Sequence, residues 1–139
     1  MVTLFDTNAL IYAFDPTSPF HNWAGKMLFQ ALAGDGAAVN PVILAELCVG
    51  DHDPATVQAR LERLGFVFLD LPCAASNRAA EAFASCLLAR KKSGVKIDRK
   101  VPLPDFFIGA HAELLGLPLA SGDTDRYQLY FPDVILISP

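Results

Sequence analysis

The feature that most constrains the fold is a short apolar run at the start of the chain that ends at a carboxylate. Residues 2–5 are long enough for a buried strand and too short for a helix, and the run stops at Asp6. The chain turns at Thr7 and Asn8 and continues as the apolar segment 9–14, which favours a mostly buried helix capped by one of these two residues. Asp6 is therefore expected at the carboxyl end of a central strand, where open α/β sheets bind ligands.

A carboxylate buried at such an edge needs a compensating charge, because an unpaired ion out of water costs several kcal/mol or more. The remainder of the chain must therefore supply either a cation or further acids that hold a metal ion. It supplies further acids.

Short apolar runs alternate with helical patterns along the rest of the chain. We expect strands at 37–39, 66–69, 117–120 and 134–137, and helices at 21–33, 41–49, 54–64, 74–92 and 106–115, the last opened by Leu103-Pro104-Asp105. This alternation is typical of a parallel sheet covered on both faces. The expected fold class is α/β: a three-layer α/β/α sandwich with a central, mainly parallel sheet, formed by a single domain over residues 1–139.

Composition excludes several classes of protein. Hydrophobic residues are 53% and charged residues 19% of the chain, which argues against disorder. No apolar run approaches the roughly 20 residues of a membrane helix, and Met1 leads straight into the first strand, so we expect a cytoplasmic protein without a membrane partner. Cys48, Cys73 and Cys86 are odd in number and lack CxxC spacing, which predicts buried reduced thiols.

The net charge of −4 argues against a nucleic-acid partner, but its distribution argues for one. Six of the eleven basic residues fall in one segment: Arg90, Lys91, Lys92, Lys96, Arg99 and Lys100. Such a segment could follow the phosphates of RNA, or it could be a solvated helix end and loop. We favour RNA, because an acidic cleft needs basic neighbours to attract a polyanion.

Four carboxylates stand where the apolar pattern does not require them: Asp6, Glu46, Asp105 and Asp123. Each alone has an ordinary explanation as a turn, a helix start or a solvated helix edge. Together they can converge, because two follow strands at one sheet edge, one opens a helix there, and Glu46 lies about a turn into its own helix. Such a cluster would repel strongly without a divalent cation, and oxygen ligands favour Mg²⁺ or Mn²⁺ over zinc. Asp125 could aid the metal or merely face water.

These residues carry a resemblance to a known family. Asp6-Thr7-Asn8 after a strand, Glu46 in the third helix, Pro104-Asp105-x-x-Ile108 at a helix start and Ser121-Gly122-Asp123 after a strand resemble the PIN-domain nucleases. The size and layout are similar to the VapC-type toxins of toxin–antitoxin pairs. Two departures are Ser121-Gly122, where the family often has Thr-Arg or Thr-Asn, and Phe106, where it often has Ala.

The resemblance implies a Mg²⁺- or Mn²⁺-dependent endoribonuclease. One or two ions held by Asp6, Asp105, Asp123 and Glu46 would activate a water molecule that attacks the RNA phosphodiester. Thr7, Asn8 and Ser121 would orient carboxylates or bind phosphate, or would be simple caps and turn residues. His21, His52 and His111 are expected to be structural.

The resemblance also implies partners: a homodimer, and a small antitoxin whose tail lies in an apolar groove near the early helices and could bring a basic side chain to the acids. The candidate groove residues, which could instead be core, are Ile11, Tyr12, Phe14, Phe20 and Trp23.

Two other classes stay open at this stage. A Mg²⁺-dependent phosphatase or phosphotransferase would use a strand-end Asp as nucleophile, but its usual second Asp is Asn8 here and no Lys follows a strand end. A catalytically inactive module that binds RNA or protein would have little reason to keep Glu46 in an apolar helix. The residues also leave open the RNA target, the number of metal ions, the identity of the antitoxin, and whether the nuclease is a toxin or a housekeeping enzyme.

Overall fold

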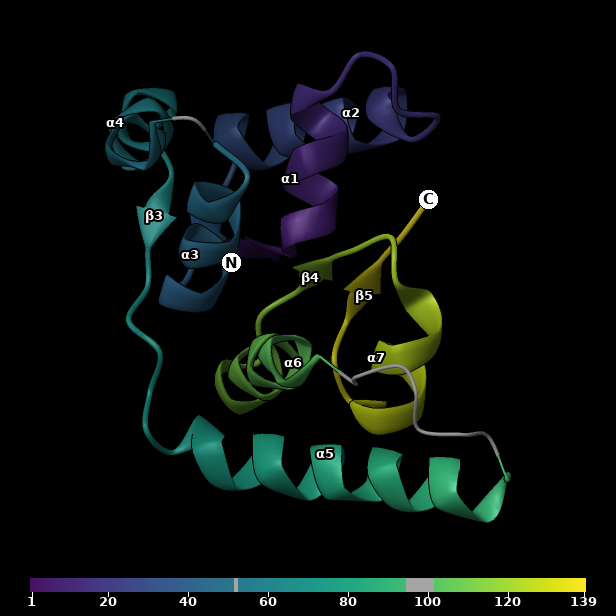
Figure 1. Ribbon diagram of the computed structural model, residues 1–139. Helices are drawn as coiled ribbons and strands as arrows, with labels where there is room; N and C mark the ends of the chain where they lie inside the picture. Colours follow the sequence, from purple (N-terminus) through teal and green to yellow (C-terminus); the bar gives the residue numbers. More distant parts are fainter. Residues whose placement is uncertain (52, 95–101) are drawn as a thin grey trace.

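The computed structural model describes residues 1–51, 53–94 and 102–139 (Figure 1). Within these residues, five strands form one sheet in the order β3-β2-β1-β4-β5, and each neighbouring pair is parallel. The strands are β1 (Thr3–Phe5), β2 (Ala37–Val39), β3 (Val67–Phe68), β4 (Leu119–Ala120) and β5 (Leu136–Ile137). Helices α1 (Thr7–Phe14) and α3 (Pro41–Val49) begin within two residues of the ends of β1 and β2.

The helices are α1 (Thr7–Phe14), α2 (His21–Ala33), α3 (Pro41–Val49), α4 (Pro54–Leu64), α5 (Ala75–Lys92), α6 (Leu103–Leu115) and α7 (Thr124–Tyr130). Figure 1 shows α1 and α2 on one side of the sheet and α5, α6 and α7 on the other, with α3 and α4 towards the β3 end. The predicted three-layer α/β/α sandwich is confirmed. Among the described residues, no helix combines the length and hydropathy of a membrane span.

The centre of the sheet is apolar on both faces. Leu4 and Phe5 of β1 and all of β2 are buried. Continuous burial of this kind is expected for strands of a parallel sheet with helices on both sides. The strand order also places the topological switch point between β1 and β4, since the chain proceeds from β1 to β2 in one direction and later returns to the other side of β1.

One helix was not predicted, and the expected capping residue of another is wrong. The sequence patterns predict no element between Asp123 and the last strand, and this segment forms α7. Its pattern is weak because it spans only seven residues, with Tyr127 buried and Leu129 exposed. The residue that caps α1 is Asp6, not Thr7 or Asn8, since the Asp6 carboxylate accepts a hydrogen bond from the Thr7 backbone N–H.

The three cysteines are free, as expected, but only Cys86 is fully buried. Cys73 is exposed because it lies in the turn ahead of α5 and not inside a helix. The prediction of buried thiols is therefore correct for Cys86 alone, and Cys48 is half-buried.

Candidate active site

Asp6 lies at the carboxyl end of β1 and is only 3% exposed. Its Oδ1 accepts a hydrogen bond from the Thr7 backbone N–H at 2.8 Å. Its Oδ2 accepts bonds from the Ser121 hydroxyl at 2.7 Å and the Tyr127 hydroxyl at 3.0 Å. Burial raises the pKa of Asp6, and these hydrogen bonds oppose that rise. Donors from α1, α7 and the end of β4 thus hold one carboxylate in a defined orientation.

Glu46 reaches this site from α3, a helix that begins at Pro41 and is capped by the Asn40 side chain, which accepts from the Ile43 N–H at 2.9 Å. The Thr7 hydroxyl donates to Glu46 Oε1 at 2.7 Å. Because Thr7 directly follows Asp6, this bond places the second acid beside the first.

The end of β4 is tied to the start of α1 by a small network. Asn8 Oδ1 accepts a hydrogen bond from the Gly122 N–H at 3.0 Å, and the Ser121 hydroxyl accepts one from the Asp123 N–H at 3.0 Å. A Cβ at Gly122 would lie 2.7 Å from the ring of Tyr12, so this position admits no side chain without displacing that ring. Tyr12 therefore occupies the space that a larger residue at position 122 would need.

Asp105 and Asp123 meet at one cation, the guanidinium of Arg126. Arg126 Nη1 donates to Asp105 Oδ2 and lies 3.2 Å from Asp123 Oδ2. Asp105 is the third residue of α6, and Asp123 directly precedes α7, the helix that carries Arg126.

Burial, together with the charges of Asp6, Glu46 and Asp123, raises the pKa of Asp105 to about 6, against the opposing effect of Arg126. The charges of the other three predicted acids therefore all act on Asp105. The structure brings them together at the switch point between β1 and β4.

The donor set fits a hard divalent cation, because it consists of carboxylate oxygens in partly desolvated surroundings with more negative charge than Arg126 neutralises. As the side chains stand, no group of three or more His, Cys, Asp or Glu among the described residues is arranged to hold an ion. Each acid is instead engaged by a protein donor, two by hydroxyl groups and two by Arg126.

The remaining predicted residues are Asp125 and the basic segment. Asp125 is exposed in the first turn of α7, which matches the interpretation that it faces water. Lys91 and Lys92 are exposed at the end of α5 and Arg90 is half-buried there, whereas Lys96, Arg99 and Lys100 lie outside the described residues.

The two described histidines each contact another part of the fold through one ring nitrogen. His21 Nδ1 lies 3.0 Å from the Tyr12 carbonyl oxygen, and the buried His111 contacts the Asn40 side chain at 3.1 Å. His52 lies outside the described residues.

Sequence reasoning missed Arg126 and Tyr127, both on α7. A weak signal exists: they follow Asp123 by three and four residues, the spacing at which helical side chains share a face. Because no helix was predicted for this segment, the spacing could not show that these side chains share a face with Asp123.

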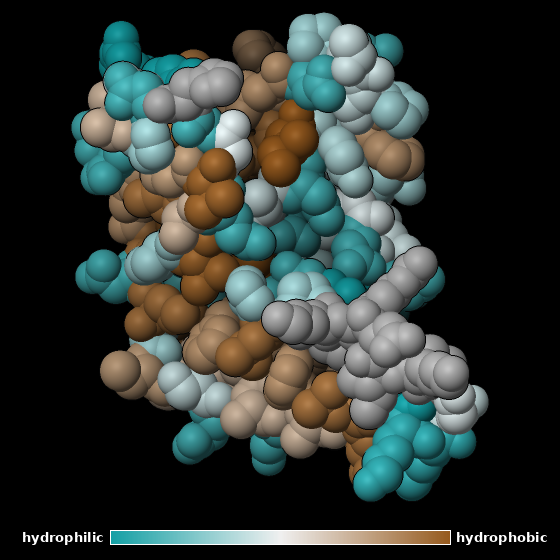
Figure 2. All heavy atoms as spheres, viewed as in Figure 1, coloured by the Kyte–Doolittle hydropathy of each residue, from teal (hydrophilic) through white to brown (hydrophobic). Residues whose placement is uncertain are grey.

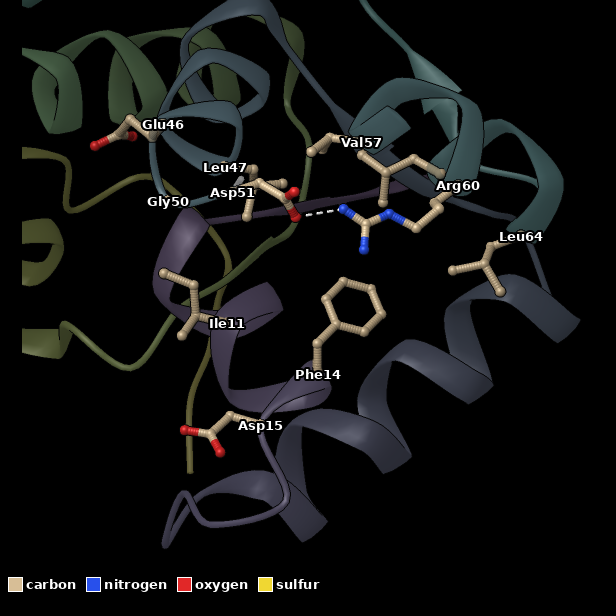
Figure 3. Close-up of a pocket in the computed structure, with 11 residues that line it drawn as sticks. Ile11, Phe14, Asp15, Glu46, Leu47, Gly50, Asp51, Val57, Arg60 and Leu64 are labelled. Atoms are coloured by element: carbon tan, nitrogen blue, oxygen red, sulfur yellow. Dashed lines mark hydrogen bonds and ion pairs between the residues drawn. The ribbon is translucent and has the colours of Figure 1, made fainter. Parts of the chain in front are cut away.

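An apolar groove of about 440 Å³ lies beside the acids, between α1, α3 and α4 (Figure 3). The lining residues are Ile11, Phe14, Asp15, Glu46, Leu47, Gly50, Asp51, Val57, Arg60, Leu61 and Leu64. Figure 3 shows Glu46 at the end opposite Leu64, with the Asp51–Arg60 ion pair between them. The groove thus leads directly to one of the four acids.

Two of the five predicted groove residues, Ile11 and Phe14, line this groove and are each 50% exposed. Tyr12 and Phe20 instead pack against each other with ring centroids 5.2 Å apart, and Trp23 packs against the core. Figure 2 shows hydrophobic residues gathered over α3 and the nearby part of α1, beside a hydrophilic area in the middle of the face.

The PIN domain family model matches residues 3–132, and the chain belongs to this family. Three solved structures share its fold. VapBC2 from Rickettsia felis, bound to a promoter DNA fragment, has a TM-score of 0.69 at 17% identity, covering 100% of this chain and 99% of the matched chain. FitAcB from Neisseria gonorrhoeae has a TM-score of 0.68 at 21% identity, with 100% and 98% covered.

The third structure is Mycobacterium tuberculosis VapC20, described as a sarcin-ricin loop cleaving toxin. It has a TM-score of 0.62 at 16% identity, with 99% of each chain covered. A comparison with curated protein sequences gives no match.

Proposed function

We propose that this protein is a Mg²⁺- or Mn²⁺-dependent endoribonuclease of the VapC toxin class. The observation that carries the proposal is the convergence of Asp6, Glu46, Asp105 and Asp123, from four separate chain segments, at the switch point of a PIN-domain sheet. The similarity to VapC20, which is described as cleaving the sarcin-ricin loop, favours RNA as the substrate.

The four carboxylates would hold the cation, which when bound lowers the pKa of a nearby water and stabilises negative charge on the reacting phosphodiester. Thr7 orients Glu46 through its hydroxyl, so that the carboxylate can accept a proton from the attacking water. Ser121 and Tyr127 hold Asp6 in place and limit its rotation.

The test is cleavage of a panel of structured RNAs, including tRNAs and a sarcin–ricin loop oligonucleotide, in Mg²⁺, Mn²⁺ or EDTA. We expect cutting only with metal, and a loss of at least about a hundredfold in rate for Asp6→Asn, because the central carboxylate is removed. Asp125→Asn is the matched control: it removes one acid from the exposed start of α7 and should leave the rate unchanged. Cleavage that continues in EDTA, or in a folded Asp6→Asn variant, would contradict the proposal.

We also propose that the groove between α1, α3 and α4 receives the tail of an antitoxin. A solved structure from Klebsiella pneumoniae with the same fold, with a TM-score of 0.63 at 24% identity, is described as a toxin–antitoxin complex, which supports an antitoxin as partner. The exposed apolar side chains of Ile11, Phe14 and Leu64 give such a tail a surface to cover, and the groove ends at Glu46. A homodimer stays a prediction, which light scattering can measure.

We expect Leu64→Asp to weaken the complex with the product of an adjacent short reading frame by at least about tenfold, because it places a charge in the apolar groove. Phe29→Asp is the matched control, since Phe29 is 73% exposed on α2 and does not line the groove. Calorimetric titration measures both affinities, and an equal loss in the two variants would remove the groove from the proposal.

A further inference from the structure

Arg126 occupies the place in the acid cluster where a cation is required. Its Nη1 contacts Asp105 Oδ2 and lies 3.2 Å from Asp123 Oδ2, so one nitrogen serves two carboxylates from different segments. The side chain is only 21% exposed, and its guanidinium lies 6.0 Å from the ring centroid of Phe106. Arg126 is therefore largely shielded from solvent and is held by these two carboxylates.

The remaining acids are satisfied in another way. Asp6 and Glu46 accept hydrogen bonds from the hydroxyls of Ser121, Tyr127 and Thr7, which carry no charge. Among the described contacts of the four acids, Arg126 supplies the positive charge. A divalent cation that takes Asp105 Oδ2 and Asp123 Oδ2 as ligands must replace the Nη1 contacts. A cation bound through the other oxygen of each carboxylate would still be repelled by the adjacent guanidinium charge.

We propose that Arg126 is the resident counter-ion of this site and competes with the divalent metal ion for Asp105 and Asp123. This inference rests on the metal-dependent function proposed above. In the metal-free protein, Arg126 keeps the acids together. It also weakens metal binding, because its two contacts must be broken before a metal ion can take the same oxygen atoms. Removal of Arg126 should therefore lower the stability of the metal-free protein and raise its affinity for metal.

The first measurement is calorimetric titration of Mn²⁺ into EDTA-dialysed protein at low ionic strength. We expect Arg126→Met to bind Mn²⁺ about tenfold more tightly than the wild type, within the range usual for coupling through shared residues. Arg126→Gln, which keeps an amide donor without the charge, should shift the affinity in the same direction. Arg63→Met is the matched control, because Arg63 is exposed on α4 and bonds to the Ala59 carbonyl.

The second measurement is thermal unfolding in EDTA and in saturating Mn²⁺. We expect Arg126→Met to unfold at a lower temperature than the wild type in EDTA and to show a larger rise in midpoint on adding Mn²⁺. A merely structural role would lower the first midpoint without tightening Mn²⁺ binding, and a role in assisting the metal would weaken that binding.

Equal or weaker Mn²⁺ binding by both variants, with clear binding by the wild type, would overturn this inference and leave the proposed nuclease intact. Absence of Mn²⁺ binding in the wild type and in both variants would overturn the metal-dependent function as well. Tight binding only in the variants would support the competition directly.

Discussion

At the scale of single residues, the site depends on uncharged donors as much as on acids. The Asp6 carboxylate is buried, and the two hydroxyls that contact its Oδ2 come from Ser121 and from Tyr127, 115 and 121 residues further along the chain. Both hydroxyls favour the anion, because their hydrogen bonds lower the pKa of Asp6 against the rise that burial causes. Tyr127 thus supports the site although it lies outside the acid motifs.

Tyr127→Phe removes one of these donors and preserves the ring. We expect the free energy of unfolding to fall by about 1–3 kcal/mol at pH 7, because the buried Asp6 charge loses a hydrogen bond. The pKa of Asp6 should rise further, since the Tyr127 bond lowers it in the wild type. Urea denaturation measures the first effect, with Tyr12→Phe, whose ring packs against Phe20, as control.

If Tyr127→Phe were as stable as the wild type and as Tyr12→Phe, the hydroxyl bond to Asp6 would contribute nothing to the stability of the fold. Ring packing between Tyr127 and Phe131, with centroids 6.4 Å apart, would then be the whole role of this side chain.

At the scale of elements, α6 positions Asp105 through close contact with the end of α7. A Cβ at Gly109 would lie 2.4 Å from the nearest atom of the Phe131 ring, so glycine allows this approach. Arg78 from α5 stacks on the same ring at 5.0 Å and pairs with Glu113 of α6 at 2.7 Å. Helices α5 and α6 and the end of α7 therefore pack together around Phe131.

We expect Gly109→Ala to lower the free energy of unfolding by about 1–3 kcal/mol, because the added methyl group must displace the Phe131 ring. Gly25→Ala is the matched control: Gly25 lies inside α2, and a Cβ there would meet nothing within 4 Å. The control should raise stability by about 0.5–1 kcal/mol through helix propensity. Denaturant titration measures the stability of both variants. An increase in stability for Gly109→Ala would contradict this account.

At the scale of the whole molecule, the acid cluster ties stability to pH. The pKa of Asp105 is about 6 in the folded protein, whereas the ordinary pKa of an aspartate is 3.8. Between pH 3.8 and pH 6 the folded state therefore binds more protons than the unfolded state. Stability contributed by this group is present below pH 4 and is lost as pH rises through 6. Burial lowers the pKa of His111, which acts in the opposite sense below about pH 6.5.

Asp105→Asn isolates the first effect in metal-free protein. We expect its free energy of unfolding, relative to the wild type, to increase from pH 4 to pH 8 by up to about 3 kcal/mol, because the charge that is costly to bury is absent. Chemical denaturation in EDTA across this range measures the difference, and Asp125→Asn should show none of it. A flat difference for Asp105→Asn would mean that this carboxyl keeps its ordinary pKa in the folded protein.

Much of the fold was predictable because its signals are local. The alternation of short apolar runs with helical patterns predicted the parallel sandwich, and burial of whole strands such as Ala37–Val39 reflects the same composition. The four acids were recognisable because each interrupts an apolar pattern or follows a strand, as Glu46 does in α3. Helix α7 was not predicted, because seven residues give too few turns for a clear apolar periodicity.

By itself, the sequence determined the fold class and the set of acids, since apolar periodicity and strand-end carboxylates are properties of neighbouring residues. Only the tertiary structure decided how those acids are balanced: Arg126 between Asp105 and Asp123, Tyr127 on Asp6, and the ring of Tyr12 against Gly122. The physical reason is that these contacts join residues brought together by strand order and helix packing. Sequence spacing carries no direct record of such distances.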